Sequence, residues 1–187
     1  AAALTTVNYF HIYYSQEAVR AMTPYVDVIA ANYNLDGPEG WLAHYFFDGL
    51  AVLTGKPILI SEFFCAAMEN RTGNKNAGHL LTVATQNERA AVVQQALQNF
   101  ARFPHIIGIH WFQYYDEPKA GRPDGEDFNM GLVDIYDQPY EEVIASFQRI
   151  SPLLPRLHAQ TTVGRPPLQD ASATVLTKAS GVIDVTD

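Results

Sequence analysis

The 187-residue sequence has a single cysteine, Cys65, so no disulfide can form within the chain. Positive charge is also scarce, because 12 Lys and Arg stand against 20 Asp and Glu, a net charge of -8. Nucleic acids and anionic membrane surfaces require clustered Lys and Arg, so we expect neither as a partner. No apolar stretch approaches the roughly 20 residues of a membrane span. The opening AAALTTVNYF lacks the basic start of a secretory signal, which leaves localisation open.

Apolar residues, by contrast, are abundant. Hydrophobic residues make up 48% of the chain and charged residues 17%, the composition of a folded chain long enough for one domain with a sizeable core. Aromatic residues reach 12%, which suits stacking on sugar rings and equally suits an ordinary core. No metal-ligand spacing and no phosphate-binding loop occurs, so we expect no cofactor and no metal.

Short apolar runs alternate with helical patterns along the chain. The apolar runs are typical of parallel strands covered on both faces and cover residues 25–33, 57–64 and 105–115. The helical patterns cover residues 15–22, 39–55, 85–103 and 138–154. This order predicts a parallel α/β architecture. Beyond Ala159 the pattern fades, and residues 160–187 are interpreted as a tail or linker.

The predicted helices carry end signals. Ser15 is a predicted N-cap, Thr85 with Glu88 forms a capping box, and Gly55 is a predicted C-cap. Long polar loops follow the second and third predicted strands, over residues 65–84 and 116–137. Such loops leave the carboxyl ends of strands, where the ligand sites of α/β folds lie.

The apolar run 57–64 ends on a carboxylate, Glu62. At the tip of a parallel strand such a side chain points toward the ligand-binding end of the fold. Phe63, Phe64 and Trp111 would desolvate the carboxylate and shift its pKa. Tyr33 ends the preceding strand, where its phenol either hydrogen-bonds Glu62 or is a partly buried group with another partner.

The third strand ends on Trp111, which is either a platform for stacking on a sugar or a buried core residue. Three stretches of the chain then resemble a known family: YVDVIAANYN, GKPILISEFF and IIGIHWFQYYDEPKAGRPDGEDFNMGLVDIYDQPYEEV. They are similar to the last three strands of clan-A glycoside hydrolases, retaining (β/α)8-barrel enzymes, and most like β-agarases and β-galactosidase-like enzymes. The resemblance covers about residues 25–151. It implies a parallel TIM barrel of which residues 1–159 form the C-terminal portion, from about strand five or six to strand eight.

The resemblance also implies roles for individual residues. Glu62 matches the nucleophile, Tyr33 the residue that orients it, and Trp111 the stacking platform. The implied reaction is hydrolysis of a β-glycosidic bond in a poly- or oligosaccharide, by two carboxyls about 5 Å apart. Further candidates for contacts with substrate hydroxyls are His110, Gln113 and Asn32.

One part of the family pattern is missing. The acid/base Glu of this clan ends the fourth strand, commonly after an Asn, but Asn87-Glu88 here reads as part of a capping box. A full barrel takes about 250 residues. We therefore expect the acid/base to come from an absent N-terminal half or from another chain, and the isolated chain to have little activity. Three alternatives stay open: a non-catalytic carbohydrate-binding module, an assembly part that pairs its open sheet edges, and another α/β enzyme with Glu62 as general base.

Overall fold

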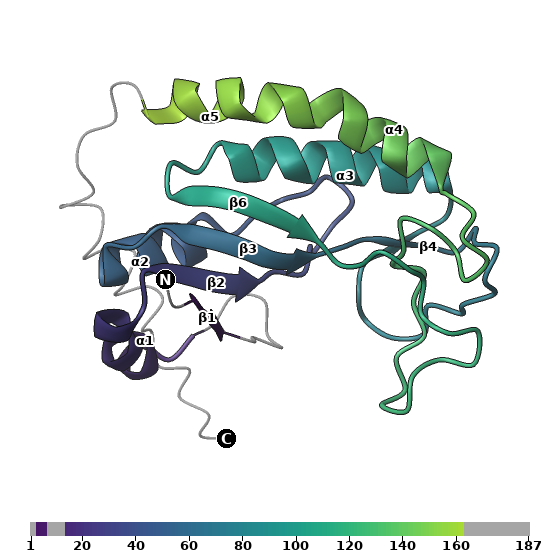
Figure 1. The fold of residues 1–187 in the computed structure, drawn as a ribbon, viewed down its shortest axis with the longest axis horizontal. Helices are drawn as coiled ribbons and strands as arrows, with labels where there is room; N and C mark the ends of the chain where they lie inside the picture. Colours follow the sequence, from purple (N-terminus) through teal and green to yellow (C-terminus); the bar gives the residue numbers. More distant parts are fainter. Residues whose placement is uncertain (1–2, 7–13, 163–187) are drawn as a thin grey trace, which may run out of the picture.

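The computed structural model describes residues 3–6 and 14–162, and the side chains of residues 14–161. Its main sheet is parallel, with strand order β1-β2-β3-β6 (Figure 1). The strands are β1 (Ala3–Thr6), β2 (Val28–Asn32), β3 (Ile58–Phe63) and β6 (Ile106–Trp111). The three predicted apolar runs therefore each contain a strand, and β3, which carries Glu62, lies between β2 and β6.

The first four helices follow the predicted order, and a fifth was not predicted. They are α1 (Gln16–Met22), α2 (His44–Thr54), α3 (Gln86–Ala101), α4 (Glu141–Ile150) and α5 (Leu154–Thr162), with short 3-10 turns η1 (Thr23–Tyr25) and η2 (Ser151–Leu153). The caps at Ser15, Thr85 and Gly55 are confirmed, the last with Gly55 at φ 63°. Helix α5 ends at Thr162, past residue 160, where the tail was predicted to begin. Residues 163–187 lie outside the described residues.

Helix α2 begins five residues later than the sequence predicts. The predicted start was residue 39, but Gly40 has φ 64°, which a right-handed helix does not accommodate. A Cβ at Gly40 would lie 3.0 Å from the backbone nitrogen of Ala96, so the turn also allows a close approach to α3. Trp41 and Leu42 therefore lie in the loop before α2, where Leu42 is buried and Trp41 is exposed.

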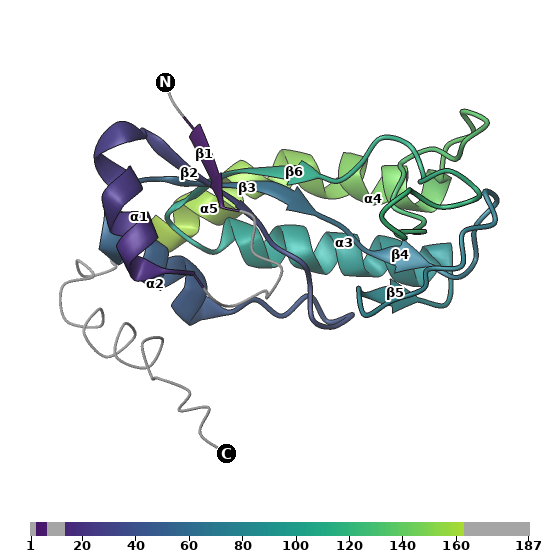
Figure 2. The same cartoon turned by 90° about the horizontal axis from the view of Figure 1, so that it is seen from below.

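The core lies between one face of the sheet and the helices. Four strand residues on this face are fully buried: Ile29, Ala31, Ile58 and Ile60. They pack in one cluster with residues of α2, α3 and α4. Helix α3 packs against both β6 and α4 (Figures 1 and 2). By strand alternation, the residues between these positions point to the opposite, open face.

Two register shifts interrupt this alternation at the carboxyl end of β3. Ile60 pairs with Ile109 and Phe63 with Trp111, so two residues of β3 lie opposite one of β6. This two-against-one arrangement is a β-bulge. It allows Ile60 and Phe63, three residues apart, both to be fully buried on the helix side. The two residues between them, Ser61 and Glu62, are only partly buried.

The long loop after β3 contains a small element that the sequence did not indicate. Strands β4 (Ala66–Ala67) and β5 (Thr82–Val83) pair in parallel, and Figure 2 shows them beside the first turns of α3. Within the described residues, no helix is long and apolar enough to cross a membrane.

Candidate functional site

The candidate site lies at the carboxyl ends of β2, β3 and β6. Asn32 ends β2 and is the register partner of Glu62 on β3, and Trp111 ends β6. The arrowheads of these strands point toward the end of the molecule that carries the two long loops (Figure 1). The ligand-binding end predicted from the sequence is thus built from strand ends and loops, as in other parallel α/β folds.

Glu62 is partly buried, and its surroundings shift the pKa of its carboxyl. Burial raises the pKa of its carboxyl above the ordinary value, while hydrogen bonding to the Asn32 side chain opposes the rise. Two residues of the loop after β6 act in opposite senses, because Glu126 raises this pKa and Arg122 lowers it. The loop of residues 116–137 therefore comes close enough to Glu62 to contribute to its electrostatic environment.

Asn32 is itself held by a neighbour of Glu62. The hydroxyl of Ser61 donates to Oδ1 of Asn32 at 2.7 Å. A backbone hydrogen bond joins the two strands next to this pair, because the N–H of Tyr33 donates to the carbonyl of Glu62 at 2.8 Å. The three polar side chains Ser61, Asn32 and Glu62 thus form a compact group at the junction of β2 and β3.

The structure gives the Tyr33 hydroxyl a partner other than Glu62, and the role of Tyr33 in orienting Glu62 stays a prediction. The Tyr33 side chain is fully buried on the helix side, next to Phe46, Phe47 and Phe100. Its hydroxyl accepts from the N–H of Ala43 at 2.8 Å. The physical reason is strand alternation, which turns Tyr33 into the core and its neighbour Asn32 toward Glu62.

Trp111 is partly buried and contacts both the core and the loop after β6. It pairs with the buried Phe63, and its ring meets the ring of Phe63 edge to face at 5.2 Å. Its indole N–H donates to the carbonyl of Met130 at 2.9 Å, and the guanidinium of Arg89 lies 5.3 Å from its ring centre. Trp111 thus joins the core to the loop after β6, and its role as a platform for stacking on a sugar stays a prediction.

The remaining predicted substrate contacts lie at the same end of β6. His110 is exposed and lies on the opposite side of the strand from Trp111 by alternation. Gln113 is half-buried, and its backbone N–H donates to the carbonyl of Met130. Their contacts with a substrate stay predictions, as does that of Asn32.

A charged cluster covers the loop beside Glu62. Arg122 forms ion pairs with Asp124 at 2.6 Å, Glu126 at 2.9 Å and Glu117 at 3.4 Å. Glu117 is fully buried, and its Oε2 accepts from the backbone N–H of Phe128 at 2.6 Å. Burial raises the pKa of Glu117. The cluster fixes the loop, and its carboxylates are already engaged with Arg122.

A buried carboxylate, Asp116, connects the two long loops. Its Oδ1 accepts from the side-chain amide of Asn129 at 2.6 Å and from the N–H of Gly131 at 2.8 Å. Its Oδ2 accepts from the hydroxyls of Thr72 at 2.7 Å and Tyr140 at 2.6 Å. A Cβ at Gly131 would lie 2.2 Å from the backbone nitrogen of Asp116, so only glycine permits this approach. The network holds both loops at the strand ends.

A buried cation supports the same region. Arg89 of α3 is fully buried and donates to the carbonyls of Cys65 at 2.7 Å and Gly131 at 2.8 Å. Its guanidinium lies between the rings of Trp111 and Tyr140. Burial lowers the pKa of Arg89 to about 10, so the group is still charged at neutral pH.

The sequence reasoning missed three contributors to the site. Ser61 was passed over because a serine beside a glutamate carries no distinctive signal. Glu117 and Asp116 were covered only as part of a turn-rich loop, although the adjacent Asp-Glu directly after a strand end was the available signal. In the described residues no group of three or more His, Cys, Asp or Glu could hold a metal ion.

Comparison with known proteins gives relatives over most of the described chain. β-Agarase B of Vibrio sp. strain JT0107 is 32% identical over 139 residues, which are 72% of this chain and 14% of that protein. β-Agarase A of the same strain is 31% identical over 127 residues, 66% of this chain and 12% of that protein. No family model matches the sequence.

A solved structure agrees with these relatives. An exo-β-agarase superposes with a TM-score of 0.71 at 30% identity, over 83% of this chain and 20% of that one. The chain thus spans about an eighth to a fifth of the length of these proteins. It belongs with the glycoside hydrolases, as a relative of the β-agarases over the part that it shares with them.

Proposed function

We propose that this chain is the C-terminal portion of a (β/α)8 barrel in a retaining glycoside hydrolase that acts on agarose or a related β-linked polysaccharide. The observation that carries the proposal is the position of Glu62, on the open face at the carboxyl end of the strand between β2 and β6. The β-agarase relatives support the substrate class.

In this mechanism Glu62 is the nucleophile. Its ionised carboxylate attacks the anomeric carbon and forms a covalent glycosyl-enzyme. The bond to the glycosidic oxygen breaks in the same step, and this oxygen takes a proton from a second carboxyl group. Water, activated by the same second carboxyl group, then releases the sugar and restores Glu62. Asn32 holds the attacking carboxylate, and Arg122 favours its charged form.

The described residues offer poor candidates for the second carboxyl group. Glu126 is already engaged with the guanidinium of Arg122 at 2.9 Å. Glu117 is fully buried, and its carboxyl accepts a hydrogen bond from the backbone N–H of Phe128, so a substrate does not reach it. We therefore place the proton donor on barrel strands outside this chain.

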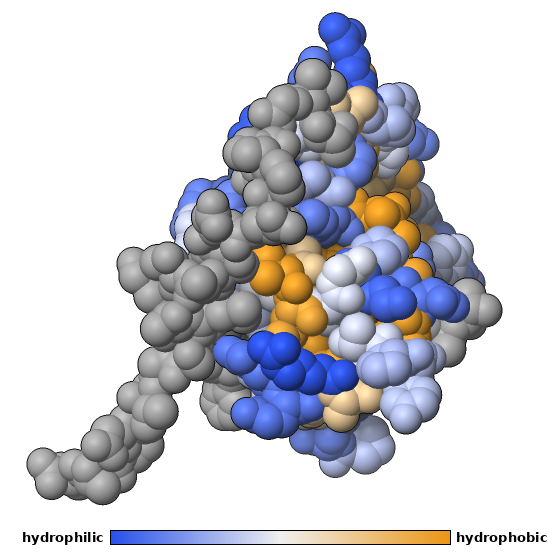
Figure 3. Space-filling model, turned by 90° about the vertical axis from the view of Figure 1, so that its left-hand side faces the viewer, coloured by the Kyte–Doolittle hydropathy of each residue, from blue (hydrophilic) through white to orange (hydrophobic). Residues whose placement is uncertain are grey.

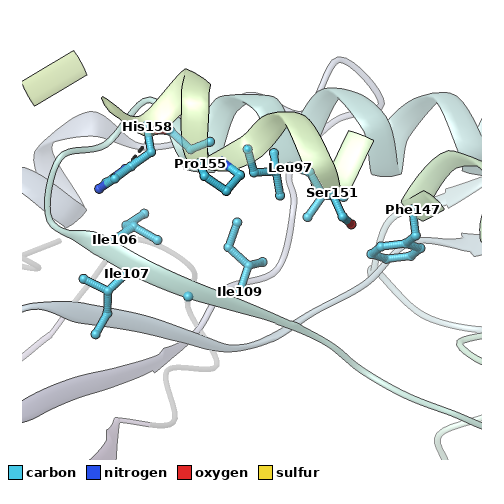
Figure 4. A pocket seen from close by; sticks show the side chains of 11 residues that line it. Leu97, Ile106, Ile107, Ile109, Phe147, Ser151, Pro155 and His158 are labelled. Carbon is cyan, nitrogen blue, oxygen red and sulfur yellow. Dashed lines mark hydrogen bonds between the residues drawn. The ribbon is translucent and has the colours of Figure 1, made fainter. Parts of the chain in front are cut away.

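The edge of the sheet at β6 supports a continuation of the barrel. β6 is the last strand of the sheet in the described part, and Ile107 is 60% exposed. Beside it, a cavity of about 530 Å³ opens between β6 and the helices, and Figure 4 shows Ile106 and Ile109 facing Leu97 and Pro155 across it. Apolar surface is also exposed at the end of the molecule shown in Figure 3. We assign this edge to the first strand of the missing part of the barrel, with apolar side chains that enter the cavity.

The test compares two proteins on agarose. One is the 187-residue chain, and the other is the open reading frame that encodes it, expressed at its full natural length and called the full-length protein below. We expect reducing sugar to be released by the full-length protein and not by the chain alone. Turnover by the pure 187-residue chain that is lost in Glu62→Gln would contradict the missing proton donor. Saccharide binding without hydrolysis by the full-length protein would favour the binding-module alternative.

A further inference from the structure

Ser61 occupies an unusual position beside the proposed nucleophile. In a regular strand, Ser61 and Glu62 would point to opposite faces of the sheet. The bulge in β3 removes this constraint, because both residues lie between the pairs Ile60–Ile109 and Phe63–Trp111. The Ser61 hydroxyl can therefore contact the same neighbour as Glu62, which is Asn32.

The geometry of Asn32 makes this shared contact informative. Its side-chain amide has an acceptor end, Oδ1, and a donor end, Nδ2, which a half-turn about the terminal bond exchanges. The Ser61 hydroxyl donates to Oδ1 at 2.7 Å. An ionised carboxylate accepts hydrogen bonds only, so it is stabilised by Nδ2 and repelled by Oδ1. The bond from Ser61 thus favours the amide orientation that presents its donor end to Glu62.

We propose that Ser61 is a positioning residue that acts on Glu62 through Asn32, by fixing which end of the Asn32 amide faces the carboxylate. The inference rests on the proposed role of Glu62 as nucleophile for its functional meaning, but the contact itself is independent of turnover. It differs from the orienting role expected of Tyr33, whose hydroxyl is engaged with the N–H of Ala43.

Other charged groups affect the pKa of Glu62 independently of the Ser61–Asn32 hydrogen bond. Arg122 and Glu126, both from the loop after β6, act on its carboxyl in opposite directions, and burial adds to the effect of Glu126. All of these stay in place when Ser61 is changed. The contribution of Ser61 can therefore be measured as a difference between variants.

The measurement is a 13C NMR titration of the Glu62 carboxyl in the 187-residue chain, with labelled glutamate and Glu62→Gln to assign the signal. We expect Ser61→Ala to raise the pKa of Glu62 by a few tenths of a pH unit, because the amide loses its preferred orientation. Ser61→Thr keeps the hydroxyl and should restore the wild-type titration. Asn32→Ala should raise the pKa at least as much as Ser61→Ala does.

The double variant gives the sharpest outcome. If Ser61 acts through Asn32, Ser61→Ala has no further effect on the titration once Asn32 is alanine. Additive effects, or an unchanged titration in Ser61→Ala, would overturn the proposal. Ser146→Ala is the matched control. It also removes a buried serine hydroxyl, but this hydroxyl donates to the carbonyl of Ala90 and not to Asn32. It should lower stability and leave the Glu62 titration unchanged.

The pair Ser61→Ala and Ser61→Thr decides the proposal by itself if Asn32→Ala does not fold. Failure of the proposed function is seen separately. If the full-length Glu62→Gln variant keeps its turnover while the titrations follow the expected pattern, Glu62 is not the nucleophile and the contact from Ser61 through Asn32 still holds.

Discussion

In the full-length protein, replacing Glu62 by glutamine is expected to lower kcat on agarose at least about 1,000-fold, or about 4 kcal/mol of transition-state stabilisation. Glutamine has nearly the shape of glutamate but lacks the charge that attacks the anomeric carbon. The measurement is reducing-sugar release under saturating substrate. Glu62→Ala should behave in the same way and be partly rescued by azide, which can enter the space left by the carboxylate.

Two controls separate lost chemistry from lost structure. Glu142→Gln changes an exposed glutamate at the start of α4 and should keep wild-type activity.

Glu62→Gln itself should be at least as stable as the wild type. Because burial raises the folded-state pKa of Glu62, its ionised form destabilises the fold once the pH exceeds that pKa. We expect Tm at pH 7 to be higher in the variant than in the wild type and this difference to vanish below pH 4.5, the ordinary pKa of a glutamate. Retained activity, or an unfolded variant, would count against this account of Glu62.

The largest expected loss of stability comes from Asp116. Asp116→Ala removes a buried carboxylate that accepts four hydrogen bonds, from Asn129, Gly131, Thr72 and Tyr140. Each donor is then left without its partner in a buried site, so we expect the free energy of unfolding to fall by about 3 to 5 kcal/mol. Urea unfolding followed by circular dichroism measures the change.

Variants of the same network should give graded effects. Asp116→Asn keeps the shape and one acceptor oxygen, and the hydroxyls of Thr72 and Tyr140 can rotate to accept from its amide, so a smaller loss is expected. Tyr140→Phe removes a hydroxyl that donates to Asp116 and accepts from the N–H of Arg71, with an expected cost of about 1 to 2 kcal/mol. An Asp116→Ala variant that unfolds like the wild type would show that the network does not hold the two loops.

The sequence predicted the elements of the fold well because they have local signals. The apolar runs, the capping box at Thr85 and the glycine cap at Gly55 each act over a few neighbouring residues. Helix α2 was extended too far, because the apolar spacing around Trp41 does not reveal the left-handed turn at Gly40. Helix α5 was not predicted, because the last predicted helix ends at residue 154, where Pro152 and Pro155 indicate a break in the helical pattern.

The candidate site was predicted in its position but not in its detail. Glu62 could be located because a carboxylate directly follows an apolar run. The surroundings of Tyr33 and Trp111 could not be predicted, because the face on which a residue lies depends on strand register and packing, which the sequence alone does not show. Ser61 had no sequence signal, because its importance arises from the contact with Asn32 on another strand.

The most direct test of the central claim is covalent trapping on the full-length protein. An activated 2-fluoro-β-glycoside slows release of the sugar from a retaining enzyme, so the glycosyl-enzyme accumulates and can be digested and sequenced by mass spectrometry. We predict one sugar per protein molecule, attached to the peptide that carries Glu62 and absent in Glu62→Gln. Attachment to another carboxylate, or hydrolysis of agarose with no covalent adduct, would contradict the assignment of Glu62 as the nucleophile of a retaining glycoside hydrolase.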